Sequence, residues 1–217
     1  MSKIKVKYQT IEFNNNIDIH IKTLKNNQQF EDIDDVAQKL GISSAQWPLF
    51  GILWPSSIIL ANLVLSYNIK NKRILEIGCG IALASHILNH RLADITSTDY
   101  HPSVEEFLIS NTKLNNGKEI PFERTAWNDN NDNLGKFDLI IGSDLLYEET
   151  HIEELSNFIN NHSNKSCEVI IIDPGRNNLN KFTRKMKQYS FESSINKDLD
   201  LSNLNIEFKG KVIHYNR

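Results

Sequence analysis

The sequence has few of the features that mark secreted, metal-binding or nucleic-acid-binding proteins. Only two cysteines, Cys79 and Cys167, occur in 217 residues, far apart and without the spacing of metal ligands. Lysine and arginine total 24 against 27 acidic residues, so the net charge of −3 gives no general attraction for nucleic-acid phosphates. We therefore expect reduced cysteines, no bound metal and no nucleic-acid substrate.

Long hydrophobic segments are also missing from the sequence. The first residues, MSKIKVKYQT, carry positive charges but lack the apolar region of a secretory leader. The most apolar window, Ser57 to Leu65, is shorter than the roughly 20 residues of a membrane span and contains Asn62. These absences predict a cytoplasmic protein that does not cross a membrane.

The most informative segment is RILEIGCGIA, from Arg73 to Ala82. Its short apolar run suits a buried strand of a parallel sheet. Gly78 and Gly80 follow, and glycine allows the backbone to turn sharply and to approach a ligand closely before the next helix begins. The length of the chain suits one domain with helices on both faces of a central sheet. The segment therefore predicts a loop that holds a nucleotide.

A second predicted strand, Ala93 to Asp99, ends in an acidic residue. Asp99 lies about 20 residues beyond the first glycine, where a strand end meets ribose hydroxyls in a doubly wound fold. The loop does not fit the GxGxxG fingerprint of dinucleotide-binding enzymes, because Leu83 stands where the third small residue is needed. The two segments together predict a cofactor site of another kind.

Three further motifs define a resemblance to a known family. Glu76 precedes the glycines in an ExGxG pattern, DLLY spans Asp144 to Tyr147, and DPGR spans Asp173 to Arg176. Together with a Trp-Pro pair at Trp54, they resemble family 16 of the seven-strand S-adenosylmethionine-dependent methyltransferases, the protein lysine methyltransferases. DPGR resembles the electron-transfer-flavoprotein β-subunit lysine methyltransferase branch and its bacterial relatives. The resemblance covers roughly Trp47 to the C-terminus.

The resemblance implies the fold. We expect an α/β chain, with a Rossmann-like seven-stranded methyltransferase sheet, helices on both faces, an antiparallel C-terminal strand pair and an N-terminal β-hairpin. The hairpin and a helix would form an extension over residues 1–45, and residues 46–217 would form the methyltransferase domain. The chain would be a monomer or a weak oligomer. Ile81 and Ala82 depart from the family pattern, because many relatives carry a further glycine there, and they predict a slightly stiffer loop.

The resemblance also implies which residues form the site. S-adenosylmethionine would be the methyl donor and S-adenosylhomocysteine the product, with no metal. Asp144 and Tyr147 would face the acceptor, because a carboxylate can orient an amine and an aromatic face can stabilise a methylated cation. The residues expected at the cofactor are Trp54, Glu76, Gly78, Gly80, Asp99, Tyr100, Trp127 and Ser143.

Several of these assignments have a purely structural alternative. Trp54 and Tyr147 could be packed aromatic residues, and Asp144 could cap the N-terminus of a helix. His101 could contact the cofactor or make a local hydrogen bond. Arg176 could contact the acceptor or brace its own loop through a neighbouring acid. The sequence leaves these alternatives open.

The predicted function is methyl transfer to a nitrogen acceptor, a protein lysine side chain. An anionic mouth would favour such a cationic substrate, and the acids that could form it are Asp144, Glu148, Glu149, Glu153 and Glu154. Histidine acceptors, a small-molecule N-methyltransferase of the nicotinamide or amine type, and a non-catalytic cofactor-binding module are alternatives. The loop disfavours a dinucleotide-dependent oxidoreductase. GxSxG and HExxH motifs are absent, and in-line methyl transfer requires neither.

Hydrophobic periodicity predicts the remaining elements. Alternating residues predict strands over 4–13 and 17–24, and a helical pattern covers Glu31 to Leu40. Capping-box patterns beginning at Ser103 and Thr150 predict helix starts. Two closing strands are expected over 191–195 and 204–215.

Overall fold

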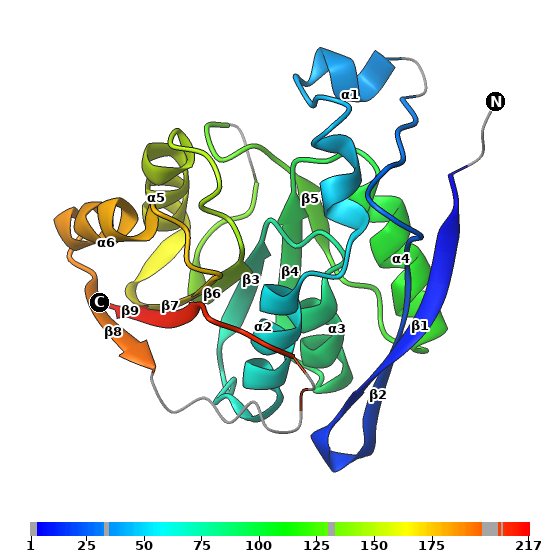
Figure 1. Ribbon diagram of the computed structural model, residues 1–217. Helices are drawn as coiled ribbons and strands as arrows, with labels where there is room; N and C mark the ends of the chain where they lie inside the picture. Colours follow the sequence, from blue (N-terminus) through cyan, green and yellow to red (C-terminus); the bar gives the residue numbers. More distant parts are fainter. Residues whose placement is uncertain (1–3, 33–34, 130–132, 197–203, 205) are drawn as a thin grey trace.

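The computed structural model describes residues 4–32, 35–129, 133–196, 204 and 206–217. A seven-stranded sheet forms its centre, with the strand order β5, β4, β3, β6, β7, β9, β8 (Figure 1). The strands are β3 (Arg73–Ile77), β4 (Asp94–Asp99), β5 (Phe122–Arg124), β6 (Phe137–Ser143), β7 (Ser163–Asp173), β8 (Glu192–Asn196) and β9 (Lys211–Asn216). Strand β9 runs antiparallel to both of its neighbours. The sheet and its antiparallel C-terminal pair confirm the predicted architecture.

Helices cover both faces of this sheet, as predicted (Figure 1). The helices α2 (Pro55–Ser66), α3 (Leu83–His90) and α4 (Val104–Leu114) pack in the apolar cluster on one face. The helices α5 (His151–His162) and α6 (Leu179–Gln188) pack in the cluster on the other face. Because side chains alternate along a strand, neighbours such as Ile74 and Leu75 are buried on opposite faces. Central strands therefore carry continuous apolar runs.

The order of the strands fixes where a ligand can bind. β3 pairs in parallel with β4 on one side and with β6 on the other. From β3 the chain adds β4 and β5 towards one edge of the sheet, and then returns to add β6 and β7 on the other side of β3, so the strand order reverses between β3 and β6. In open α/β sheets, ligands bind beyond the carboxyl ends of the strands at such a switch point. The ends of β3, β4 and β6 meet there.

The N-terminal hairpin, β1 (Val6–Phe13) and β2 (Ile17–Leu24), packs beside α4 (Figure 1). Asn111 of α4 and Asn115, the residue that follows this helix, bind the backbone of β2. Asn111 accepts the Lys22 N–H at 2.7 Å and donates to the Lys22 carbonyl at 3.3 Å. Asn115 makes the same two bonds to His20, at 2.8 and 2.7 Å. The amides thus satisfy backbone groups that an edge strand would leave unpaired.

Some local predictions are wrong in extent. In the stretch predicted as a helix over 31–40, the structure has α1 (Val36–Lys39), and residues 33 and 34 lie outside the described residues. Asp32 lies before this helix and accepts the N–H groups of Ala37 and Gln38, so it acts as a cap rather than as a helical residue. The last strand begins at Lys211 rather than 204, because its partner β7 ends at the opposite residue, Asp173. Residue 205 is also outside the described part.

The two predicted capping boxes are not formed. Ser103 and Thr150 precede α4 and α5, but neither makes a side-chain capping hydrogen bond. Both have helical backbone angles, whereas a capping side chain needs an extended backbone to reach the first turn. The helices begin where predicted and are stabilised by packing instead.

One stretch of the described residues, Trp47–Ser66, is long and apolar enough to cross a membrane by length and composition. The expectation that no stretch reaches this length is therefore wrong. The stretch is divided, because a 3₁₀ helix, Trp47–Gly51, is separated from α2 by an extended backbone at Ile52 and Trp54. α2 packs against α3, β6 and β7. Core helices pass the same test, so the result does not establish a membrane span.

Glu76 is buried beneath the glycine loop. Its carboxylate accepts the Ser85 N–H at 2.8 Å and also the Ser85 hydroxyl, which lies 2.7 Å from the Ser97 hydroxyl. This network joins β3 and β4 to the first turn of α3. Burial raises the pKa of Glu76 to about 7, and the hydrogen bonds from Ser85 oppose part of that effect.

The raised pKa of Glu76 predicts a pH-dependent stability. Because the folded chain holds this proton more tightly than the unfolded chain, the fold loses stability as pH rises from about 4.5 to about 7. A tenfold change in proton affinity is worth about 1.4 kcal/mol, so the loss reaches at most about 3.5 kcal/mol. We expect Glu76→Gln to abolish this loss, measured by urea unfolding of both proteins at pH 5 and pH 8.

The comparison of wild type with Glu76→Gln also controls for the pH dependence that other buried groups give to stability. Burial lowers the pKa of His86 and of His101 to about 4, which costs stability as pH falls, and this effect is common to wild type and variant. A stability difference between wild type and Glu76→Gln that is equal at pH 5 and pH 8 would contradict the prediction.

The asparagine contacts of the hairpin predict a second stability effect. We expect Asn111→Ala to lower the free energy of unfolding by about 1–3 kcal/mol, because it leaves the backbone N–H and carbonyl of Lys22 without these partners. Chemical denaturation measures the change. Lys113→Ala, at an exposed position of the same helix, is the matched control and should change stability by about 0.5 kcal/mol at most. Equal effects of the two substitutions would refute the role of the amide.

Candidate functional site

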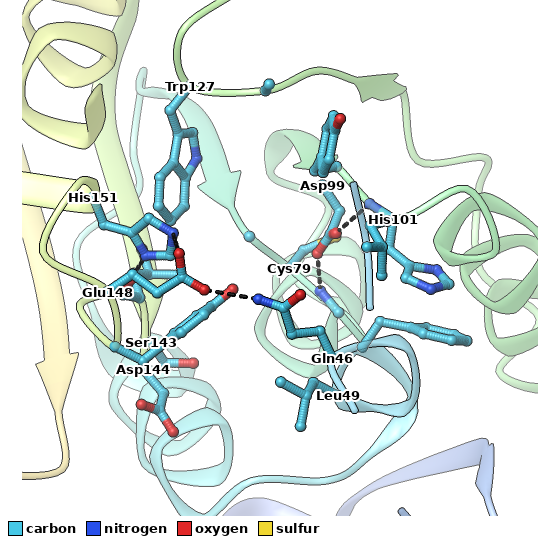
Figure 2. Close-up of a pocket in the computed structure, with 18 of the residues that line it drawn as sticks. Gln46, Leu49, Cys79, Asp99, His101, Trp127, Ser143, Asp144, Glu148 and His151 are labelled. Carbon is cyan, nitrogen blue, oxygen red and sulfur yellow. Dashed lines mark hydrogen bonds and ion pairs between the residues drawn. The ribbon is translucent and has the colours of Figure 1, made fainter. Parts of the chain in front are cut away.

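A pocket of about 520 Å³ opens at the carboxyl edge of the sheet, beyond β3, β4 and β6 (Figure 2). The loops that follow these strands form its floor and sides, and residues between 40 and 57 complete its wall. Its volume lies within the range of small-molecule sites. The pocket is therefore where the switch point of the sheet predicts a ligand.

The pocket brings together the predicted site residues, with one exception. The residues that line it are Trp54, Gly78, Gly80, Asp99, Tyr100, Trp127, Ser143, Asp144 and Tyr147. Glu76 does not line it, because its side chain points to Ser85 below the loop. In the structure, Glu76 supports the loop from beneath rather than facing the cavity.

Both glycines of the loop are required by their backbone angles and by the lack of space for a side chain. Both have positive φ angles, 56° at Gly78 and 52° at Gly80. A Cβ atom at Gly78 would lie 2.6 Å from the Leu145 side chain, and one at Gly80 would lie 2.9 Å from the Phe50 carbonyl oxygen. Ala82 also has a positive φ angle, 58°. The loop thus takes a glycine-like conformation at Ala82 despite the side chain, at a steric cost of roughly 1–2 kcal/mol.

Asp99 fixes this loop against the end of β4. One carboxylate oxygen accepts the Gly80 N–H and the other accepts the His101 N–H, both at 2.9 Å (Figure 2). Burial raises the pKa of Asp99, and backbone hydrogen bonds from His101, Gly80 and Tyr100 oppose the rise. A carboxylate can accept about four hydrogen bonds, so Asp99 keeps acceptor capacity beside these backbone donors. The donor and acceptor set therefore fits a ligand with neighbouring hydroxyl groups.

Aromatic residues form the wall beside Asp99. His101 stacks on Phe50 with ring centroids 4.1 Å apart, and its Nδ1 accepts the Ser103 N–H at 3.1 Å. This is the local hydrogen bond that the sequence offered as one reading of His101, although the ring also lines the pocket. The Trp54 indole donates to the Leu49 carbonyl at 3.0 Å. Trp54 therefore holds the segment before α2 against the pocket.

Tyr100 also fixes part of the pocket wall through a hydrogen bond to the backbone. Its hydroxyl donates to the Leu40 carbonyl at 2.7 Å. This bond links the loop after β4 to the residues that follow α1. Trp127 lies on the opposite wall, where its ring meets the edge of His151 with centroids 4.9 Å apart. These contacts connect three separate parts of the chain around one cavity.

Asp144 and Tyr147 lie at the end of β6, and Arg176 joins them. The Arg176 guanidinium donates from Nε to one Asp144 oxygen at 2.8 Å, and its Nη2 forms an ion pair with the same oxygen at 2.7 Å. Its central carbon also lies 5.8 Å from the centre of the Tyr147 ring. Arg176 therefore braces the loop through an acid, and Asp144, with a φ of 56°, does not cap a helix. Burial raises the pKa of Asp144, and Arg176 opposes part of that rise.

Sequence reasoning missed Gln46 and His151 at the pocket mouth, and it named Glu148 only as one acid of a predicted anionic mouth. Gln46 donates to a Glu148 oxygen at 2.8 Å, across the opening (Figure 2). His151 lies between Trp127 and Tyr147, with its ring centroid 4.6 Å from that of Tyr147. Nearness to the DLLY motif was the available signal for His151. No pattern marked Gln46, because its role depends on a contact about 100 residues away in sequence.

The predicted anionic mouth is only partly present. Glu149 and Glu153 pair with Lys181 and Lys185 of α6, so these two acids belong to a helix interface. Glu148 and Glu154 line the pocket, and Asp144 is paired with Arg176. The acids are close in sequence, but they lie partly in the loop before α5 and partly on that helix, where successive residues point in different directions. The mouth keeps a weaker negative character than expected.

The cysteines are free and buried. Burial raises the pKa of the Cys79 thiol well above its usual value and also raises the pKa of the Cys167 thiol. Both groups therefore stay protonated at neutral pH. Within the part of the chain that the structure describes, no three His, Cys, Asp or Glu side chains are grouped as metal ligands.

Comparison with known proteins agrees with this geometry. A family profile described as lysine methyltransferase matches residues 36–189. The match begins within residues 1–45, which sequence reasoning assigned to a separate extension. The chain is 30% identical to protein N-lysine methyltransferase METTL21A of Danio rerio over 119 residues, 49% of this chain and 54% of that protein.

Two other curated relatives have related names. Identity is 30% over 133 residues with the electron transfer flavoprotein beta subunit lysine methyltransferase of Mus musculus, covering 59% of this chain and 51% of that protein. Sequence identity is 34% over 124 residues with the histidine protein methyltransferase 1 homolog of Dictyostelium discoideum. This match covers 53% of this chain and 40% of that protein. The chain thus spans about half the length, or less, of these relatives.

Solved structures share the fold at low sequence identity. A ribosomal protein L11 methylase from Lactobacillus delbrueckii subsp. bulgaricus has a TM-score of 0.59 at 21% identity, covering 76% of this chain and 80% of that one. The 16S rRNA methyltransferase RsmC of T. thermophilus, solved with AdoMet and guanosine, has a TM-score of 0.67 at 11% identity, covering 99% and 51%. These structures support the fold, and the family profile covers most of the chain. This chain therefore belongs to the lysine methyltransferase family.

Proposed function

We propose that this chain transfers a methyl group from S-adenosylmethionine to a nitrogen acceptor, the side chain of a protein lysine. One observation carries the proposal, namely that Asp99 and Tyr147 line the same pocket at the switch point of the sheet. Asp99 offers acceptor positions for hydroxyl groups, and Tyr147 offers an aromatic ring that is 46% exposed. Family membership and the names of the relatives support the reaction class.

The residues around Asp99 would hold the cofactor. S-adenosylmethionine supplies a methyl group on a positively charged sulfur, open to in-line attack by a nitrogen lone pair. Asp99 would accept hydrogen bonds from the ribose hydroxyls with its remaining acceptor capacity. Gly78 and Gly80 leave the floor of the pocket without side chains, so a ligand can lie directly against the backbone. The Trp127 ring provides an apolar wall.

The residues around Tyr147 would hold the acceptor. Burial raises the pKa of Tyr147 to about 12, so the ring stays neutral and its face attracts a cation without forming an ion pair. Asp144 is fixed by Arg176 and keeps its second oxygen for the amine. Alignment of the nitrogen and exclusion of water then account for much of the rate. No nucleophilic side chain is required.

The first test concerns the cofactor. We expect Asp99→Asn to weaken the binding of S-adenosylmethionine about 10- to 100-fold in titration calorimetry, because a hydrogen bond to a charged partner is worth about 1.5–3 kcal/mol. S-adenosylhomocysteine should be affected similarly. Asp94→Asn, an exposed acid at the other end of the same strand, is the matched control and should bind like wild type.

Two results would count against this assignment. Equal affinity of Asp99→Asn and wild type for S-adenosylmethionine would remove Asp99 from the cofactor site. Binding of NAD in place of S-adenosylmethionine by the wild-type chain would overturn the proposed reaction itself.

The second test concerns the acceptor. We expect the chain to transfer tritiated methyl groups from S-adenosylmethionine to extract proteins, and hydrolysis of those proteins to yield labelled methyllysine. Tyr147→Ala should lower the rate about 3- to 30-fold, because a desolvated cation–aromatic contact is worth roughly 1–2 kcal/mol. Tyr147→Phe keeps the aromatic face and should retain most of the activity.

The controls separate the competing functions. Tyr8→Ala alters an exposed tyrosine of the hairpin and should leave the rate unchanged. Labelled methylhistidine in place of methyllysine would reassign the acceptor, in line with the histidine-directed relative. Label confined to small molecules would support a small-molecule enzyme, and binding without transfer would indicate a cofactor-binding module.

A further inference from the structure

His151 lines the same pocket but has no part in the function described so far. It is the first residue of α5, and its side chain is 13% exposed. The ring lies between two aromatic residues, with the Trp127 centroid at 4.9 Å and the Tyr147 centroid at 4.6 Å, both nearly perpendicular to it. The imidazole is therefore held in one orientation beside the proposed acceptor site.

Hydrogen bonding defines which nitrogen of His151 carries a proton. Nδ1 lies 2.8 Å from the Leu145 carbonyl oxygen. A carbonyl oxygen can only accept, so Nδ1 must be the donor. In the neutral ring, Nε2 then bears the lone pair and is able to receive a proton.

The carboxylate of Glu148 lies beside Nε2 of His151. The Glu148 oxygen Oε2 lies 3.8 Å from Nε2, and the other oxygen accepts the Gln46 amide N–H at 2.8 Å. Gln46 thus orients Glu148 without neutralising it. A carboxylate at this distance attracts the positive charge that forms on the ring when Nε2 takes up a proton.

The other charged groups of the pocket are compatible with this arrangement. Glu154 of α5 and Asp99 of β4 add negative charge to the lining. Asp144 also lines it, and its charge is balanced by Arg176, whose guanidinium is bound to Asp144. Tyr147 stays neutral, since burial raises its pKa to about 12. No unpaired cation lines the pocket among the described residues to oppose protonation of His151.

We propose that His151 is a catalytic residue that removes the proton from the acceptor amine, an inference that rests on the proposed function. One N–H bond of the lysine ammonium breaks, its electron pair stays on the lysine nitrogen, and the proton bonds to Nε2 of His151. That electron pair would then bond to the methyl carbon of S-adenosylmethionine, while the carbon–sulfur bond breaks and its electron pair stays on sulfur, which leaves S-adenosylhomocysteine. The imidazolium returns the proton to solvent past Glu148, whose side chain is 44% exposed.

The chemistry explains why a base is useful here. A free lysine has a pKa of about 10.4, so only about one molecule in a thousand is neutral and nucleophilic at pH 7. Histidine is suited to accept a proton near neutral pH, and a well-placed general base contributes typically 10²- to 10⁴-fold in rate. An amine held against the Tyr147 ring lies within reach of Nε2, directly or through one water molecule.

The test is the pH dependence of methyl transfer by the full chain. We expect His151→Gln to bind S-adenosylmethionine as wild type does, and to transfer methyl groups at least about 100-fold more slowly at pH 7. Above pH 8 its rate should climb about tenfold per pH unit as the lysine ammonium loses its proton to solvent, while the wild-type rate should change much less. His90→Gln, an exposed histidine at the end of α3, is the matched control and should keep the wild-type profile.

A second variant tests the partner of His151. Glu148→Gln keeps a group that can bond to Gln46 but removes the charge, and it should slow methyl transfer at pH 7, because the positive charge that forms on His151 loses its neighbouring carboxylate. A His151→Gln rate that is lower by the same factor at every pH, or unchanged, would overturn the inference while leaving the proposed function intact. Absence of transfer by the wild-type chain on extract proteins would overturn the proposed function, and the inference with it.

Discussion

The two hydrogen bonds that Asp99 accepts from Gly80 and His101 are the constraint on which the site depends. They tie the loop after β3 to the loop after β4, and thereby fix the floor of the pocket across two neighbouring strands. A buried carboxylate is stable there because backbone N–H groups compensate for the water it has lost. Glu76 performs the complementary task below the loop, where it joins the strands to α3. Glu76 therefore supports the glycine loop from below, and Asp99 fixes the loop at the pocket, where a ligand can contact it.

The opposite wall of the pocket is built differently, from an ion pair and aromatic edges. Arg176, at the end of β7, holds Asp144 at the end of β6, so the acceptor side is also fixed across two strands. Trp127, His151 and Tyr147 pack edge to face, and this geometry orients the rings without closing the cavity. The segment around Gln46 reaches over the mouth and bonds to Glu148. Residues far apart in sequence thus share one cavity because the parallel strands all end at one edge.

Charge is distributed unevenly along the acidic stretch after β6. Glu149 and Glu153 form ion pairs with lysines of α6. Glu148 and Glu154 line the pocket. The acids of this stretch therefore divide between a surface contact and the site, because Glu148 and Glu149 lie in the loop before α5, whereas Glu153 and Glu154 are neighbours on that helix and face different directions. Exposed pairs of this kind contribute little to stability, so their main effect is to remove negative charge from the mouth.

The sequence by itself determined the parallel sheet, the loop with its two glycines and the acids at the ends of β4 and β6. These follow from apolar runs, glycine geometry and spacing along the chain, all of which are local. Only the tertiary structure decided that Glu76 faces Ser85 rather than the pocket, that Arg176 braces Asp144, and that Gln46, Glu148 and His151 meet at the mouth. The direction of a side chain and its partner depend on how distant segments pack, and no periodicity within one segment encodes that packing.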